Sequence, residues 1–318
     1  MKKFLISIDT EGDNLWAWRE GMPITSENAK HLSRFQSLCE EYGFKPTYLT
    51  NYEMATSESF VDFAKAALKR NTCSVGMHLH AWNSPPDFKL DNTAEAPEAA
   101  YLIEYPTEVM EEKIDYLTKR LANTFETPMK THRAGRWAMD ERYFSLLEKY
   151  GYIADTSATP FIDWSKNAGA TVGSKGTDYS KVPTKPYTVS NTKSLLEIPV
   201  SVRMTSKAFL SSDKSFKGNL KAIYSGLRGE AIWLRPNGRN LDKMLWLVKK
   251  IAAESDSEYI MFMLHSSEFM AGGSPTFKTN EDIERLYEHM NAVFKAASEH
   301  FEGETIDGYA EFLRRDSK

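Results

Sequence analysis

Short apolar segments alternate with amphipathic ones along most of the chain. Residues 3–9 (KFLISID) form an apolar run that ends at an acid, which is typical of a buried strand. Residues 28–42 follow with apolar side chains at helical spacing, and Gly43 then stops the pattern as a helix C-cap would. Further strands are predicted at residues 46–50, 73–78, 129–133, 152–155, 195–202, 230–235 and 258–264. Further helices are predicted at residues 57–70, 107–125, 140–150, 240–254 and 280–301.

This alternation of strands and helices is typical of a mostly parallel α/β sheet or barrel, and the number of strands favours a distorted (β/α)7-type barrel. Residues 81–106 and 161–194 interrupt the alternation and are longer than ordinary connections. We expect them to form long loops at the rim of the barrel. Neither stretch is biased enough in composition to be a linker, so we predict a single domain over residues 1–318.

Composition excludes several classes of protein. With 41% hydrophobic and 26% charged residues, the chain is neither disordered nor of low complexity. Its only cysteines, Cys39 and Cys73, rule out a disulfide framework and an all-cysteine zinc site. A metal would therefore need the seven histidines and the carboxylates. The net charge of −4 and the lack of a basic run argue against a nucleic-acid partner.

The N-terminus begins with lysines and an apolar run, as a signal peptide does. The run stops at Asp9, which makes it too short for a signal h-region of about 7–15 residues. No window approaches the ~20 apolar residues of a membrane span. We therefore expect no transmembrane segment and a cytoplasmic location.

Polar side chains gather where the predicted strands end, which is where parallel α/β folds carry their sites. Asp9 and Glu11 alternate onto one side of the first strand and would suit a general base beside a metal ligand. An acidic turn is the alternative. His78 and His80 also share one face, and two imidazoles at this spacing suit zinc or a similar divalent ion. One buried and one exposed histidine is the alternative here.

Three later strand ends carry further candidates. Arg133 could pair with the acid at the end of the first strand and keep it ionised, or form an ordinary structural ion pair. Asp155 could orient a catalytic imidazole, although a turn acid is the simpler interpretation. His265 directly ends an apolar strand and would suit a general acid or base, or could pack at the edge of the core. His132 also lies at a strand end, but we assign it no role.

In chain order, these strand ends resemble the polysaccharide deacetylase family, the NodB-homology carbohydrate esterases of family 4. The resemblance consists of an acid pair, a histidine pair, an arginine turn, an acid before an aromatic loop, and a Leu-His strand end. These are Asp9 with Glu11, His78 with His80, residues 133–137, residues 155–164, and Leu264 with His265. It spans residues 3 to about 266. The family usually spaces its two histidines four residues apart, whereas Trp82 stands at that position here.

The resemblance implies metal-dependent removal of an N-acyl group, acetyl or formyl, from a sugar, a glycan or a lipid-linked saccharide of the cell envelope. The divalent ion would be Zn²⁺ in the first place, with Co²⁺, Mn²⁺, Ni²⁺ or Fe²⁺ as alternatives. The implied metal ligands are Glu11, His78 and His80. The implied catalytic residues are Asp9 as base, Arg133 as its partner, His265 as acid and Asp155 as the residue that orients His265.

Four further residues are candidates for binding the substrate. Trp82, Trp137 and Trp164 could offer apolar faces to a sugar ring, and Arg235 could bind an acidic group on it. Ordinary packing is the alternative for each aromatic residue. Two other functions stay open: an inactive carbohydrate-binding protein, because the histidine spacing is altered, and a Mg²⁺-dependent phosphatase, because an acid ends the first strand. The oligomeric state is also open.

Overall fold

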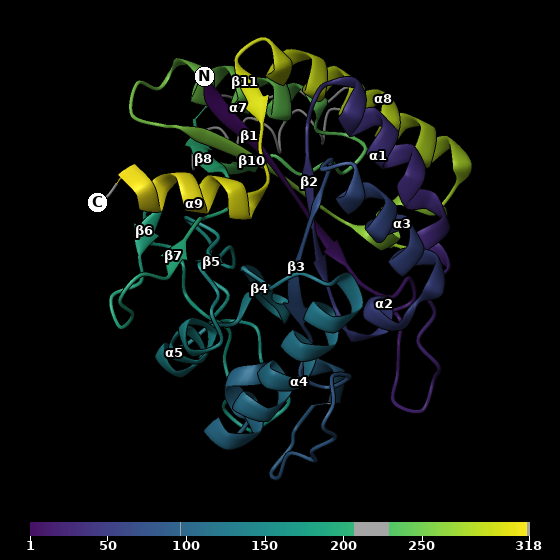
Figure 1. The fold of residues 1–318 in the computed structure, drawn as a ribbon, viewed down its shortest axis with the longest axis vertical. Coiled ribbons are helices and arrows are strands. Elements are labelled where there is room, and N and C mark those ends of the chain that lie inside the picture. The colour runs from purple at the N-terminus through teal and green to yellow at the C-terminus, as the bar shows by residue number, and fades with distance from the viewer. Residues whose placement is uncertain (96, 207–228, 317–318) are drawn as a thin grey trace.

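A curled, mostly parallel sheet with helices around it forms an open half-barrel (Figure 1). The computed structural model describes residues 1–95, 97–206 and 229–316. Within them, parallel strands follow the order β10–β1–β2–β3–β4–β5–β7. They are β1 (Lys2–Thr10), β2 (Pro46–Thr50), β3 (Ser74–Leu79), β4 (Thr131–Ala134), β5 (Ala154–Asp155), β7 (Leu196–Glu197) and β10 (Tyr259–His265). The predicted distorted (β/α) barrel is confirmed.

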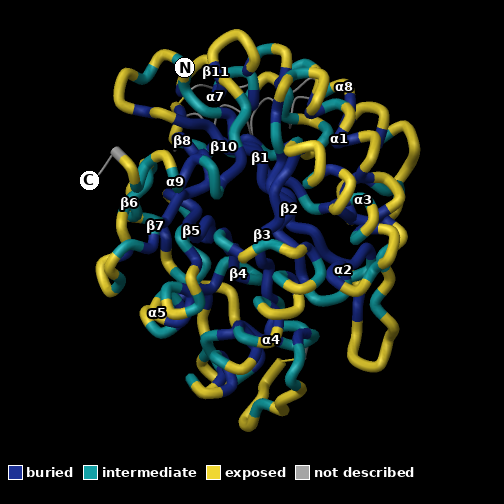
Figure 2. Tube along the Cα trace, in the orientation of Figure 1, coloured by how far each residue is buried: buried dark blue, intermediate teal, exposed yellow. Residues whose placement is uncertain are grey.

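Two short strands extend this sheet. They are β6 (Tyr187–Thr188), which pairs antiparallel with β7, and β11 (Phe301–Gly303), which pairs parallel with the start of β1. The strands are the dark, buried centre of the molecule in Figure 2, and exposed segments surround them. β1 is buried from Phe4 onward because both of its faces are covered, and its apolar residues are Phe4, Leu5, Ile6 and Ile8.

Amphipathic helices surround the sheet; all but α9 bury their apolar faces in the core on its outer side, and α9 packs against the opposite face of β1 and β10. They are α1 (Leu32–Glu41), α2 (Tyr52–Thr56), α3 (Glu58–Lys69), α4 (Thr107–Phe125), α5 (Glu141–Lys149), α7 (Leu241–Ala253), α8 (Asn280–Ser298) and α9 (Ile306–Asp316). α8 begins at a capping box, in which the Thr279 hydroxyl accepts from the Asp282 N–H and the Asp282 carboxylate accepts from the Thr279 N–H. No helix in the described ranges is long and apolar enough to cross a membrane.

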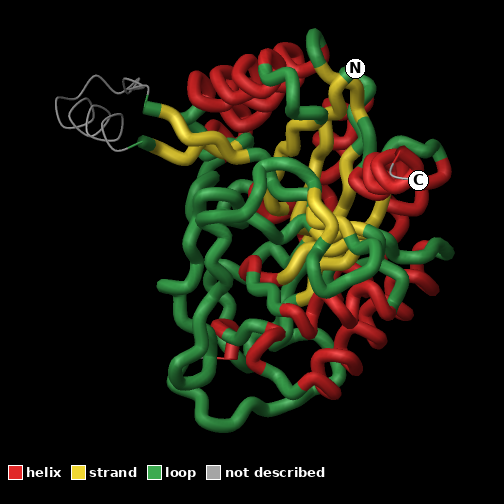
Figure 3. Tube along the Cα trace, turned by 90° about the vertical axis from the view of Figure 1, so that its left-hand side faces the viewer, coloured by secondary structure: helices red, strands yellow, loops and turns green. Residues whose placement is uncertain are grey.

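The later strands differ from the prediction. The strand expected at residues 195–202 is divided into β7 and β8 (Val202–Thr205), with Pro199 between them, which lacks a backbone N–H for the ladder. The strand expected at 230–235 is β9 (Glu230–Trp233), and it pairs antiparallel with β8 in a separate two-stranded sheet (Figure 3). The helix expected to reach residue 301 ends at Ser298, and α9 was not predicted.

The two long rim loops lie at the carboxyl ends of the strands and pack against each other. Thr93 and Thr171 form an antiparallel bridge between them. The carboxylate of Glu104 accepts hydrogen bonds from the N–H groups of Ala170 and Thr171, at 3.1 and 2.7 Å. The loops therefore form one wall over the strand ends.

Candidate metal centre and active site

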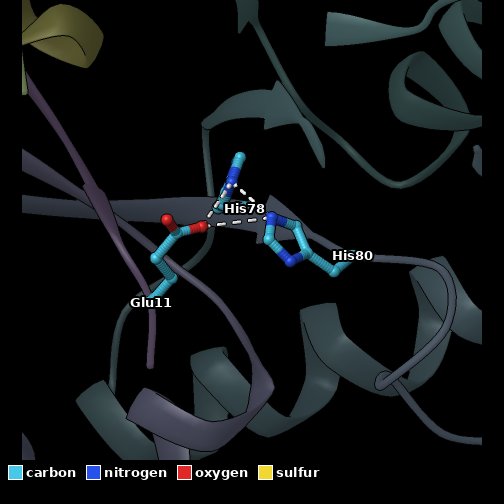
Figure 4. A group of neighbouring side chains, drawn as sticks. All are labelled: Glu11, His78 and His80. Atoms are coloured by element: carbon cyan, nitrogen blue, oxygen red, sulfur yellow. Dashed lines mark hydrogen bonds and ion pairs between the residues drawn. The ribbon is translucent and has the colours of Figure 1, made fainter. Parts of the chain in front are cut away.

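Glu11, His78 and His80 converge at the carboxyl ends of β1 and β3 (Figure 4). The Oε2 atom of Glu11 lies 3.5 Å from Nε2 of His78 and 3.2 Å from Nε2 of His80. The two Nε2 atoms are 3.0 Å apart. His78 is the last residue but one of β3, and His80 directly follows the strand, so the two-residue period places both side chains on the same side.

These donor atoms suit a divalent ion. The carbonyl of Arg133 can only accept, so Nδ1 of His78 donates to it at 2.9 Å, and the lone pair on Nε2 faces Glu11. Tetrahedral zinc with bonds of about 2.0–2.1 Å holds its ligand atoms roughly 3.3 Å apart, which matches the separations in this cluster. Two imidazole nitrogens at 3.0 Å also need a proton or a cation between them.

Asp9 is held by a fully buried arginine. Nη1 of Arg133 donates to Oδ1 of Asp9 at 2.5 Å, and Nη2 donates to the hydroxyl of Ser7 at 2.8 Å. Burial raises the pKa of Asp9, but the charge of Arg133 and the nearby His78 and His265 outweigh it and hold that pKa below its ordinary value. The expected pairing of Arg133 with Asp9 is confirmed. The second carboxylate oxygen of Asp9, Oδ2, faces His265 and lies 3.7 Å from its Nε2.

The carboxylate of Glu11 is also kept ionised. Burial raises its pKa, but His265 and the hydrogen-bonded His78 and His80 together hold the pKa well below the ordinary value. An ionised carboxylate beside two imidazoles is the protonation state that a metal requires of its ligand.

His265 is oriented by Glu268 and not by Asp155. Oε2 of Glu268 lies 3.0 Å from both Nδ1 and the backbone N of His265, and Nη2 of Arg235 lies 3.1 Å from the same Nδ1. The predicted contact between Asp155 and His265 is wrong. β5 lies on the far side of the sheet from β10, so Asp155 contacts its neighbour in register on β4 instead.

That neighbour is His132, which belongs to a buried network behind the site. Nδ1 of His132 lies 2.6 Å from Oδ1 of Asp155, and the Tyr143 hydroxyl lies 2.7 Å from Nε2. Burial lowers the pKa of His132 although Asp155 opposes the effect. Asp155 also faces its register partner Glu197 on β7. The pKa of Glu197 is raised well above its ordinary value, mainly by burial and in second place by the negative charge of Asp155.

A cavity of about 440 Å³ opens above the cluster. Trp82, Trp137, Trp164 and Arg235 all line it. Arg235 does not end a strand, because β9 stops at Trp233. Several lining side chains were not predicted: Trp16, Arg19, Glu98, Tyr101 and Asn167. The sequence did indicate Trp16, since Trp16 and Trp18 follow Glu11 in the connection after the first strand.

No protein-family model matches the chain, and no curated protein matches it in sequence. Among solved structures, a Mycobacterium smegmatis protein assigned as a polysaccharide deacetylase has a TM-score of 0.54 at 14% identity, covering 100% of this chain and 92% of that one. Puue allantoinase has a TM-score of 0.52 at 11% identity, covering 98% and 89%. The Xyl-CE4 domain of a xylanase from a Trinervitermes trinervoides hindgut metagenome has a TM-score of 0.46 at 8% identity, covering 100% and 92%. The first two similarities show that this chain shares the fold of a polysaccharide deacetylase and of an allantoinase.

Proposed function

We propose that the protein is a metal-dependent hydrolase that removes an N-acyl group, acetyl or formyl, from a sugar or glycan. The observation that carries this proposal is the convergence of Glu11, His78 and His80 beside Asp9 and His265 at one end of a single cavity. The likeness in fold to a polysaccharide deacetylase supports the same reaction.

The proposed metal is Zn²⁺, because two imidazoles and one carboxylate are donors that zinc prefers, and Co²⁺, Mn²⁺, Ni²⁺ or Fe²⁺ could replace it. Glu11, His78 and His80 would hold the ion, which supplies Lewis-acid charge for the acyl carbonyl and the attacking water. The donor set argues against a Mg²⁺-dependent phosphatase, since Mg²⁺ prefers oxygen ligands.

Proton transfer falls to two side chains. Asp9 is ionised and fixed by Arg133 through Oδ1, so Oδ2 accepts a proton from the attacking water. Nε2 of His265 donates a proton to the departing amine, while Nδ1–H on the opposite side of the ring donates to Glu268, which also pairs with Arg235. Asp9 and His265 lie close enough, with 3.7 Å between Oδ2 and Nε2, to serve the same scissile bond in turn.

The cavity walls suit a saccharide. Trp82, Trp137 and Trp164 offer flat apolar faces, and polar side chains between them can pair with hydroxyl groups. Trp82 stacks on Trp18 with ring centroids 4.5 Å apart, which fixes its orientation at the rim. Position 82 carries a histidine in the polysaccharide deacetylase family, and in this protein its tryptophan is therefore part of the cavity wall.

Metal analysis and a hydrolysis assay test this proposal. The purified protein should hold about one divalent ion per chain, and it should release acetate from an N-acetylated sugar. Chelation should abolish release, and added zinc should restore it. Hydrolysis that continues at the same rate after complete removal of the metal would contradict the mechanism. Binding of acylated glycans without turnover, even with added zinc or cobalt, would favour an inactive carbohydrate-binding protein.

A further inference from the structure

The connection after β1 forms a loop whose two ends are tied together. The backbone N–H of Asp13 donates to the carbonyl of Thr25 at 2.9 Å, and the Asp13 carboxylate accepts from the Thr25 hydroxyl. The side-chain amide of Asn14 donates to the carbonyl of Pro23 at 2.9 Å. Between these ties, most of residues 14–23 are exposed (Figure 2). The segment therefore leaves and returns at one fixed base, as a compact Ω-loop does, and can move as a unit about it.

The proposed metal ligands and proton carriers lie largely under cover. Their side chains are at most 12% exposed. Trp16 of the loop provides part of this cover, because its ring packs edge-to-face on that of His265 with the centroids 5.1 Å apart. Its Nε1 donates to the hydroxyl of Ser267 at 3.1 Å, which holds the indole in this place. A sugar that carries an acyl group would reach these atoms more freely with Trp16 moved aside.

Side-chain contacts hold the far end of the loop against the first rim loop. The ring of Trp18 stacks on Trp82, and the guanidinium of Arg19 lies 3.4 Å from the carboxylate of Glu98. Arg19 and Glu98 both line the cavity, so their ion pair joins two of its walls. The Arg19 side chain is 68% exposed. An exposed ion pair shifts an equilibrium by only about 1.5- to 5-fold, so this contact can open readily.

We propose that residues 14–23 are a lid over the proposed active site, which is latched by the ion pair of Arg19 with Glu98 and opens to admit substrate. The importance of the lid for turnover rests on the proposed function, whereas its motion does not. When closed, the lid keeps water away from His265 and the metal ligands, and electrostatic interactions among them become stronger. When open, it uncovers the path to them.

A reducible crosslink tests whether the lid must open. Arg19→Cys combined with Glu98→Cys places two thiols where the ion pair stands, and a flexible thiol crosslinker that a reductant cleaves locks the lid. The native cysteines, Cys39 and Cys73, are 0% and 5% exposed and should not react with the crosslinker. The locked and the reduced form of this one variant are then compared.

The first measurement is the modification of His265 by diethyl pyrocarbonate, followed by peptide mass spectrometry. We expect it to be at least about tenfold slower in the locked form than after reduction, because the reagent reaches a covered ring through the open state. His300 is exposed and serves as the internal reference, which should react equally in both forms. The second measurement is hydrolysis of an N-acetylated sugar, which should fall in the locked form and return on reduction.

The matched control is Arg34→Cys combined with Glu284→Cys. These residues form another exposed ion pair, between α1 and α8, and neither lines the cavity. Locking this pair should change neither the modification of His265 nor hydrolysis.

Arg19→Gln tests the latch without new cysteines. Loss of the ion pair should make the modification of His265 about 1.5- to 5-fold faster than in the unmodified protein, and Arg34→Gln should leave it unchanged.

The outcomes separate this inference from the proposed function. Equal modification of His265 in the locked and reduced forms would overturn the inference, and so would hydrolysis that locking does not slow or an unchanged rate of modification in Arg19→Gln. If no form hydrolyses a sugar, the proposed function fails, and the modification of His265 still decides whether the lid moves.

Discussion

The carboxylate of Asp9 is held by a guanidinium that is itself fully buried. Arg133 is 0% exposed, and Asp9 is its acidic partner among the described residues. Leaving one member of such a pair unpaired costs about 3–5 kcal/mol, so each side chain keeps the other in place. Because the pKa of Asp9 is lowered, this stabilisation is present above the ordinary carboxyl range and is lost as pH falls through the lowered pKa.

His265→Ala should lower kcat by about 10²–10⁴-fold because the leaving amine loses its proton donor. Zinc content should stay at one per chain, since Nε2 of His265 is 3.9 Å from Glu11 and outside the cluster of the three proposed ligands. Metal analysis beside steady-state kinetics measures both effects. The control His31→Ala changes an exposed histidine and should alter neither. Loss of zinc in His265→Ala would show instead that His265 is a ligand.

Glu53 ties together the two segments that carry the proposed ligands. Its Oε1 accepts from the N–H of Gly12, which follows Glu11, and its Oε2 accepts from the side chain of Asn83, three residues after His80. A glutamine has only one acceptor oxygen, so one of these contacts is lost in Glu53→Gln. We expect zinc affinity to fall about 10–100-fold, as for other residues that position metal ligands.

Competition with a chromophoric chelator measures this affinity. Glu58→Gln removes an exposed carboxylate from α3 and provides the matched control, which should bind zinc as the unmodified protein does. Equal affinity in Glu53→Gln and Glu58→Gln would contradict a positioning role for Glu53.

At the level of secondary-structure elements, the pairing of β5 with β7 creates a buried acid pair. Asp155 and Glu197 are partners in register, and the raised pKa of Glu197 keeps it protonated beside the ionised Asp155. The N–H of Ala158 donates to Oε1 of Glu197 at 2.9 Å. A raised carboxyl pKa gives stability that is complete below the unfolded pKa and is lost as pH rises through the folded pKa.

Glu197→Gln should therefore remove a pH dependence. An amide mimics the protonated acid, so the variant should gain stability relative to the unmodified protein as pH rises above the ordinary carboxyl range. The gain is at most about 1.4 kcal/mol per pH unit for one proton. Urea unfolding at pH 5, 6.5 and 8 measures it. A stability difference that is constant over this range would contradict a protonated Glu197.

Individual elements differ in how closely the sequence predicts them. The predicted bounds of β2 and α4 agree with the structure, because hydrophobic periodicity and a proline at each start define both locally. β8 and β9 have the composition of strands, but their antiparallel pairing is a long-range contact that periodicity does not encode. The terminal helix α9 was missed, although its apolar residues pack against Leu5 and Tyr259.

At the level of the whole molecule, the half-barrel is open at β10, and residues beside the β8–β9 sheet cover this edge. The backbone N–H of Met263 donates to the carbonyl of Leu234 at 3.2 Å, and that of Met261 donates to the Ser201 hydroxyl at 2.8 Å. This arrangement brings Arg235 beside His265.

Zinc should stabilise the whole fold, since the proposed ligands come from strands separated by β2 and meet only in the folded chain. At 100 times the dissociation constant, a ligand of the native state adds about 2.7 kcal/mol to the free energy of unfolding. We expect the melting temperature to rise by several degrees with zinc and to fall on chelation. His80→Ala should show no such shift. A shift that persists in this variant would place zinc elsewhere.

The sequence by itself determined which residue types stand at the strand ends. Period-2 alternation and the apolar runs were enough to select Asp9, Glu11, His78, His80 and His265, because strand direction and side-chain face are local properties. The tertiary structure decided which of them touch. Asp155 contacts His132 because sheet order places β4 beside β5, and His265 contacts Arg235 because the residues after β9 pack beside β10. The order of strands and the packing of loops arise from long-range contacts, which no local pattern of residues specifies.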